Sequence, residues 1–120
     1  MTLEITSSLQ NLQRTVNHHF RHIQAAHPFA RPIAVQYELA YTDYRVVQLA
    51  LQLGEQPALN AELTAAYEAV QAFEWPFIAG GPAEFAAQHG EAPAGYAQAV
   101  ATFDAVCARV AAWQGGATRH

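Results

Sequence analysis

The sequence contains no lysine, a single cysteine and only two serines, Ser7 and Ser8. Without lysine, the chain cannot form a Schiff base or place a P-loop lysine on a phosphate. Cys107 has no second cysteine with which to form an internal disulfide or a thiolate cluster, which favours a reducing cytoplasm. Neither serine lies in a nucleophile-elbow pattern. The sequence therefore gives no support to an acyl-transfer enzyme, a P-loop protein or a disulfide-stabilised scaffold.

Charge and long apolar runs are also scarce. Charged residues make up 13% of the 120 residues, about half the usual share. No stretch approaches the ~20 apolar residues that span a bilayer, and the segment from Met1 to Gln13 is too polar for a signal peptide. Alanine and glutamine replace the missing charge and favour helix. We expect a single cytoplasmic domain over residues 1–120, with a composition typical of a bacterial source.

Proline, glycine and apolar periodicity divide the chain into helices. Pro28 and Pro32 bracket one connector, Gly54 is expected to be a left-handed cap, and Pro76 is expected to end a helix at Trp75. These signals predict an all-α, up-and-down bundle of four long helices, plus one short helix between the third and the last. The expected ranges are 6–27 (or from Thr2), 32–54, 57–75, 82–90 and 93–114, with a frayed tail at 115–120.

The helix at 32–54 organises the chain because it is apolar on two opposite sides. One stripe comprises Ile33, Tyr37, Ala40, Tyr41, Tyr44, Val47 and Leu51, and the other Val35, Leu39, Val46, Leu49 and Leu53. Between them lie polar strips that hold Glu38, Arg45, Gln48 and Gln52 on one side and Gln36 and Asp43 on the other. Such a helix is expected to be covered on both sides, by its own bundle, by a partner chain, or by one of each.

Histidines cluster on the first helix. His18 and His22 are four residues apart and share a helical face, the spacing at which two imidazoles reach one metal ion. No carboxylate accompanies them in a Glu-x-x-His or His-Glu-x-x-His pattern. His18 falls on the solvent side of the helical wheel, whereas His19 borders the apolar stripe. A solvated cluster is the simpler interpretation, and a metal or haem site is the alternative.

Positive charge is concentrated near the N-terminus. No acidic residue lies between Glu4 and Glu38, whereas three arginines and four histidines do. The net charge of −4 therefore divides into about +3 in this segment and about −7 elsewhere. We expect this segment to contact an acidic surface, within its own assembly or on a partner protein. Histidine protonation near pH 6.5 would then make the contact pH-dependent. The candidate partner-binding residues are Arg14, His18, Arg21, His22 and Arg31.

Aromatic residues form a second candidate surface. The tyrosines of the 32–54 helix share one face, and their hydroxyls need partners or water when they are buried. The two interpretations are a wet bundle edge or subunit interface, and a small-molecule pocket with an acidic anchor. The residues concerned are Tyr37, Glu38, Tyr41, Tyr44, Trp75, Phe77 and Trp113. The acidic residues of the third helix, Glu62, Glu68 and Glu74, are expected to point away from its apolar face.

These patterns favour a non-catalytic helical interaction protein, with no catalytic residue and no cofactor. It is expected to self-associate or to dock on a larger protein as an adaptor, inhibitor, chaperone or immunity factor. The expected partners are protein, including a second copy, and neither membrane nor nucleic acid, because so small a basic patch would neutralise few phosphates. The alternative is a bundle that binds a small molecule, metal or haem through His18, His19 and His22 or through the tyrosine stripe.

Overall fold

The computed structural model describes residues 4–90 and 93–117, with the side chains of 4–90 and 93–115. In this part of the chain the regular structure consists of four helices, without strands. They are α1 (Thr6–Gln24), α2 (Arg31–Leu53), α3 (Pro57–His89) and α4 (Ala94–Ala117). The predicted all-helical bundle is confirmed, whereas the additional short helix between the third and the last is not present as a separate element.

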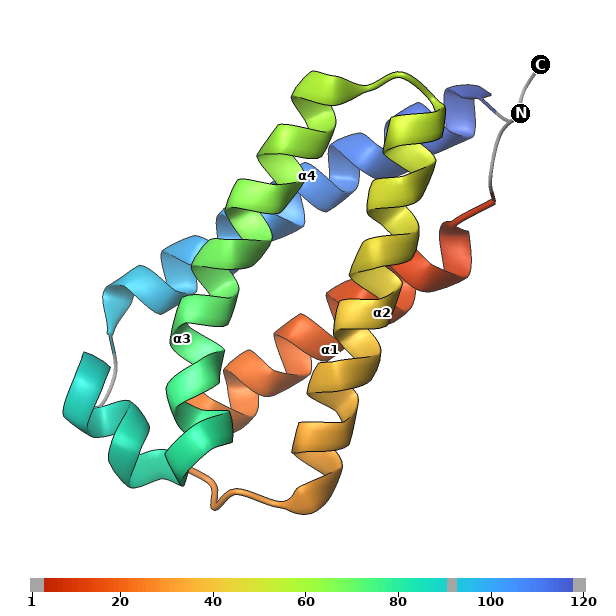
Figure 1. Cartoon of the computed structure of the whole chain (residues 1–120). Helices are drawn as coiled ribbons and strands as arrows, with labels where there is room; N and C mark the ends of the chain where they lie inside the picture. Colours follow the sequence, from red (N-terminus) through yellow and green to blue (C-terminus); the bar gives the residue numbers. More distant parts are fainter. Residues whose placement is uncertain (1–3, 91–92, 118–120) are drawn as a thin grey trace.

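Consecutive helices run in opposite directions, with α2 and α3 in front of α1 and α4 (Figure 1). Each helix packs against its neighbours in the chain, α1 also packs against α4, and α1 reaches α3 across one diagonal. Within the described residues, α2 and α4 do not pack against each other across the other diagonal. Helix α2 therefore occupies a corner of the bundle between α1 and α3.

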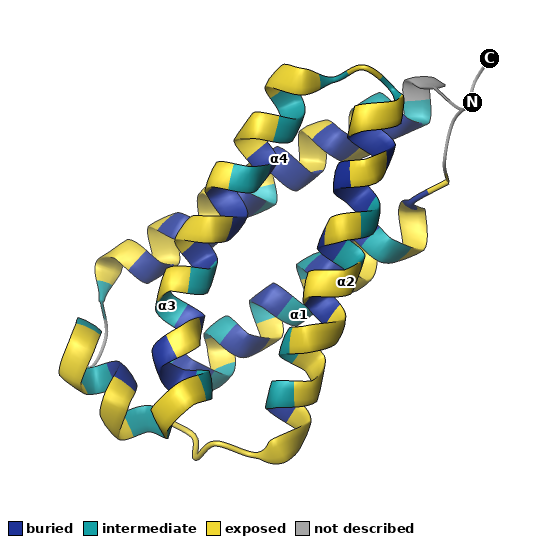
Figure 2. Ribbon diagram, viewed as in Figure 1, coloured by how far each residue is buried: buried dark blue, intermediate teal, exposed yellow. Residues whose placement is uncertain are grey.

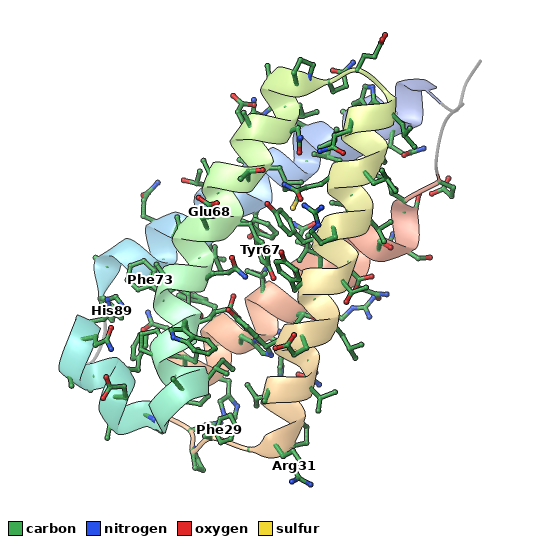
Figure 3. All side chains as sticks on the ribbon, in the orientation of Figure 1. Phe29, Arg31, Tyr67, Glu68, Phe73 and His89 are labelled. Carbon is green, nitrogen blue, oxygen red and sulfur yellow. The ribbon has the colours of Figure 1, made fainter. Side chains whose placement is uncertain are left out.

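The core lies where the buried faces of the four helices meet (Figure 2). Its largest fully buried side chains include Tyr67, Tyr96, Phe77 and Phe103. Tyr96 stacks on Phe73 with the ring centroids 5.0 Å apart. Burial of a large apolar side chain contributes about 1.5–3 kcal/mol, so this aromatic cluster is a major source of stability. Figure 3 shows Tyr67 in the space between α3 and α2.

Helix α3 continues past the predicted stop at Trp75. Pro76 lies inside the helix, where its ring removes the hydrogen bond to the carbonyl of Ala72. The side chain of His89 donates to this freed carbonyl, with 3.1 Å between His89 Nε2 and the oxygen. The helical backbone is interrupted instead at Gly81, whose φ of 76° favours glycine. The expected short helix is thus the last part of α3, which folds back so that His89 lies near Phe73 (Figure 3).

The predicted left-handed cap at Gly54 is also wrong. Gly54 has a φ of −86°, and the left-handed residue is Glu55, with a φ of 56°. Gln56 N–H donates to the Leu51 carbonyl and Glu55 N–H to the Gln52 carbonyl, as in a Schellman motif. Gly54 is needed for a different reason, because an added Cβ would lie 2.4 Å from the ring of Trp113.

At the ends of α1 and α2, Ala26→Gly and Gly54→Ala are expected to change the free energy of unfolding in opposite directions. Ala26 holds the left-handed position after α1, with a φ of 56°, so Ala26→Gly should raise the free energy of unfolding by about 0.5–1 kcal/mol. Gly54→Ala should lower it by about 1–3 kcal/mol because the methyl group collides with Trp113. Urea unfolding of both variants measures these free energies. If both substitutions raised or both lowered the free energy of unfolding, the explanations given for Ala26 and Gly54 would be contradicted.

Helix α4 runs through the glycine at which the tail was expected to begin. It continues past Gly115 to Ala117, and the rest of the predicted tail, residues 118–120, lies outside the described residues. The alternative start of the first helix at Thr2 lies outside them as well. Among the helices of the described part, none is long and apolar enough to cross a membrane.

Candidate functional site

The outer face of α2 is the most prominent apolar surface on the described part of the molecule. Four large side chains point away from the bundle: Val35 is 53% exposed, Leu39 59%, Leu49 48% and Leu53 52%. Val46 lies between them and is half-buried. We call these five residues the outer stripe. Of the outer stripe, only Val46 packs against the core of the bundle, so the possibility that the chain's own helices cover both faces is wrong.

The buried face of α2 differs from the predicted stripe. Tyr41 is exposed, whereas Ala50, which lies outside that stripe, and Gln48, expected on a polar strip, are buried. Gln48 donates to the hydroxyls of Tyr44 and Thr64, each at 2.7 Å. This small polar network joins α2 to α3 and gives the buried Tyr44 hydroxyl its partners, which buried polar groups require.

The predicted basic surface lies on the outer side of α1. Arg14, His18 and Arg21 are all exposed and share a shallow hollow with Gln36 of α2. The pKa of His18 is lowered by partial burial and by His19, His22 and Arg21 nearby. This side chain therefore gains its positive charge at a lower pH than an unperturbed histidine does.

The other two residues predicted to bind a partner do not line this hollow, although the ring centroid of His22 lies 6.2 Å from that of His18. His22 Nε2 donates to the Pro28 carbonyl at 2.9 Å and so fixes the connector after α1. Arg31 is exposed at the start of α2, where its side chain points away from the bundle (Figure 3). The predicted basic residues therefore lie on α1 and at the start of α2, and Arg31 does not line the hollow that His18 lines.

The structure separates the residues of the predicted aromatic pocket. Tyr37 and the exposed Trp75 lie together, with their ring centroids 6.3 Å apart, while Glu38 is exposed on α2. Tyr41 and Tyr44 form a second pair at 5.8 Å.

The remaining two aromatic residues lie elsewhere. Phe77 is buried against His22 and Phe29. Trp113 packs at Gly54, beyond the C-terminal end of α2. These aromatic side chains therefore serve several separate contacts.

A buried histidine and carboxylate link α1 to α3. His19 Nδ1 lies 2.7 Å from Glu74 Oε2, and the residues are only 1% and 2% exposed. The prediction that Glu74 points away from the apolar face is wrong. Its position follows Tyr67 and Val70 and precedes Phe77 at alternating spacings of three and four residues, which places it on the core stripe. That spacing is the signal that the sequence interpretation missed.

The chemistry of this pair follows from its burial. Burial raises the pKa of Glu74, and the hydrogen bond from His19 opposes the shift. Burial also raises the pKa values of Tyr67 and Tyr96, with the nearby Glu74 charge adding to both shifts. With both residues almost completely enclosed, the pair acts as a link within the core. Removing either partner would strand a polar group away from water.

The histidines of α1 have separate environments. His18 is exposed, His19 bonds to Glu74 and His22 bonds to a backbone carbonyl. Among the side chains of residues 4–90 and 93–115, no group of three or more metal-ligating residues could hold an ion.

The geometry defines a four-helix bundle with one exposed apolar helix face. No protein-family model, curated protein or solved structure matches the chain. A functional interpretation therefore rests on the surface and the core of this molecule.

Proposed function

We propose that this chain is a single-domain, non-catalytic interaction protein that binds another helix through the outer stripe of α2. The observation that carries the proposal is the exposure of Val35, Leu39, Leu49 and Leu53, each about half or more, along one line of one helix. Isolated apolar residues are common on protein surfaces, whereas a contiguous apolar patch bordered by polar residues marks an interaction site.

The surroundings of the stripe support a protein partner. Glu38, Arg45 and Gln52 line one edge of the exposed face, which matches the polar rim around an apolar interface core. The basic hollow of α1 borders the same helix near Gln36 and would favour an acidic surface on the partner. Helix-in-groove and helix-on-helix binding use apolar anchors at such spacings. The proposal includes the cytoplasm as the compartment, as expected from the single cysteine.

Site-specific photo-crosslinking in the native host tests this function. A benzophenone amino acid at position 39 or 49 keeps the stripe apolar and should give a covalent adduct of defined mass. The matched controls are positions 61 and 105, which are exposed alanines on α3 and α4. Adducts at 39 and 49 but not at 61 and 105 are expected. Absence of adducts at 39 and 49, or equal yields at all four positions, would overturn the proposal.

A further inference from the structure

The outer stripe together with the exposed Thr42 has the same spacing in both directions along α2. With Thr42 included, its residues follow one another at intervals of four, three, four, three and four: Val35, Leu39, Thr42, Val46, Leu49 and Leu53. Alternating intervals of three and four place side chains in the seam between two helices that pack at a shallow angle. Because the order of intervals is unchanged on reversal, an antiparallel copy of α2 presents the same stripe in register.

We propose that the outer stripe is an interface between two copies of this chain, with the two α2 helices packed antiparallel about a two-fold axis. The inference rests on the proposed function, because it names the partner of that same surface. In such an isologous contact every pair of facing residues occurs twice, once on each side of the two-fold axis. Leu39 faces the partner's Leu49, and Val35 faces the partner's Leu53.

The centre of the stripe suits this arrangement. Thr42 faces the partner's Val46 beside the axis, and both are small β-branched residues that let the helices approach closely. The Thr42 hydroxyl donates to the Glu38 carbonyl of its own helix at 3.3 Å. Its polar group therefore has a partner before the interface forms, so burying Thr42 strands no donor.

The charges at the two ends of α2 favour the antiparallel over the parallel arrangement. Arg31 is exposed at the start of α2, and Glu55 is exposed just after its end. A parallel pair would bring two Arg31 side chains together, whereas an antiparallel pair brings each Arg31 near the partner's Glu55. The helix dipoles are also oppositely aligned in the antiparallel pair. Both ends of the stripe thus gain a complementary contact, whereas near the axis the register that places position 38 beside the partner's position 52 also places the exposed Arg45 beside the partner's Arg45, a contact between like charges.

The size of the stripe sets the expected strength. From residue 35 to 53 a helix extends about 27 Å, and a contact between two such helices is smaller than the ~800 Å² per partner of a standard interface. We therefore expect a reversible dimer with a dissociation constant on the order of micromolar.

Cysteine cross-linking tests both the partner and the orientation. Glu38 and Gln52 are exposed at one edge of the stripe, so Glu38→Cys and Gln52→Cys leave the stripe itself intact. In the antiparallel pair, position 38 lies beside the partner's position 52, whereas the two copies of position 38 are about 18 Å apart along the axis and the two copies of position 52 about 24 Å. A short bismaleimide should therefore cross-link an equimolar mixture of the two variants but neither variant alone. Unmodified protein is the control, because burial raises the pKa of the Cys107 thiol to about 12 and keeps it unreactive.

Two results would overturn the inference. Cross-linking of Glu38→Cys with itself would indicate a parallel pair. No cross-linking in the mixture, with circular dichroism showing folded protein, would indicate that the stripe does not meet a second copy. If photo-crosslinks at positions 39 and 49 then carry the mass of another protein, the proposed function stands and only the self-partner is wrong; if those photo-crosslinks are absent too, both fail.

Discussion

Replacing His19 by leucine should lower the free energy of unfolding by about 3–5 kcal/mol, because it leaves a buried carboxylate without its partner. Glu74 is 2% exposed, and its bond to His19 Nδ1 is 2.7 Å long. The single variant removes this bond and strands Glu74 in the core between α1 and α3. Chemical denaturation of the unmodified protein and of His19→Leu at neutral pH measures the two free energies of unfolding.

The double variant His19→Leu/Glu74→Leu is the control for this effect. Replacing both polar partners with apolar groups of similar size can be nearly neutral or stabilising. We therefore expect the double variant to recover most of the stability that His19→Leu loses. Two results would show that the pair is not coupled in the core. One is a loss below about 1 kcal/mol in His19→Leu, and the other is a double variant that is no more stable than His19→Leu.

The raised pKa of Glu74 also predicts a pH dependence. Its folded-state pKa lies above the ordinary value of 4.5 because burial disfavours the charged form. The folded chain therefore holds this proton more tightly than the unfolded chain does. The stabilisation is fully present below pH 4.5 and is lost as the pH rises through the folded-state pKa. Glu74→Gln keeps a hydrogen-bonding group but cannot titrate. The free energy of unfolding of the unmodified protein, relative to that of Glu74→Gln, should therefore fall as the pH rises through the folded-state pKa of Glu74.

Leu49→Glu should weaken association of the chain at least about 100-fold, because it places a carboxylate in an apolar contact. Leu49 is 48% exposed in the single chain, so the substitution should change the free energy of unfolding of the isolated chain by no more than about 0.5 kcal/mol. In the two-fold arrangement each copy contributes one such carboxylate, and both face the partner's Leu39. Light scattering over a dilution series gives the dissociation constants of the unmodified protein and of Leu49→Glu for comparison.

Ala105→Glu is the matched control because it adds the same charge on the exposed side of α4. It should leave association unchanged within about two-fold, a change of about 0.4 kcal/mol. Equal weakening by the two substitutions would indicate an effect of net charge, and no effect of Leu49→Glu would exclude the outer stripe as the contact.

The sequence predicts the helices well because apolar periodicity and helix-stop residues are local signals. The two stripes of α2 could be read directly from residue spacing, although spacing does not say whether a neighbouring helix or another chain covers each one. Pro76 and Gly54 show the limit of local rules. The carbonyl that Pro76 frees finds its partner in His89, 17 residues away from Ala72 in the sequence, and Gly54 is explained by Trp113 of α4.

The buried pair shows a second limit. Glu74 and His19 each occupy a core position in the spacing of their helices, but an ionisable residue at such a position is usually expected to avoid the core. Only the approach of α1 to α3 brings the two groups together and makes burial of both tolerable. The pairing thus depends on how helices meet in space, which spacing within one helix does not specify.

Sedimentation equilibrium of the unmodified protein over a wide concentration range tests the pairing of α2 most directly. The predicted result is a weight-average mass that rises from the 13.1 kDa of one chain towards twice that value, with the rise absent in Leu49→Glu. A mass of 13.1 kDa at every concentration, up to about 1 mM, roughly a thousandfold above the expected dissociation constant, would contradict the pairing.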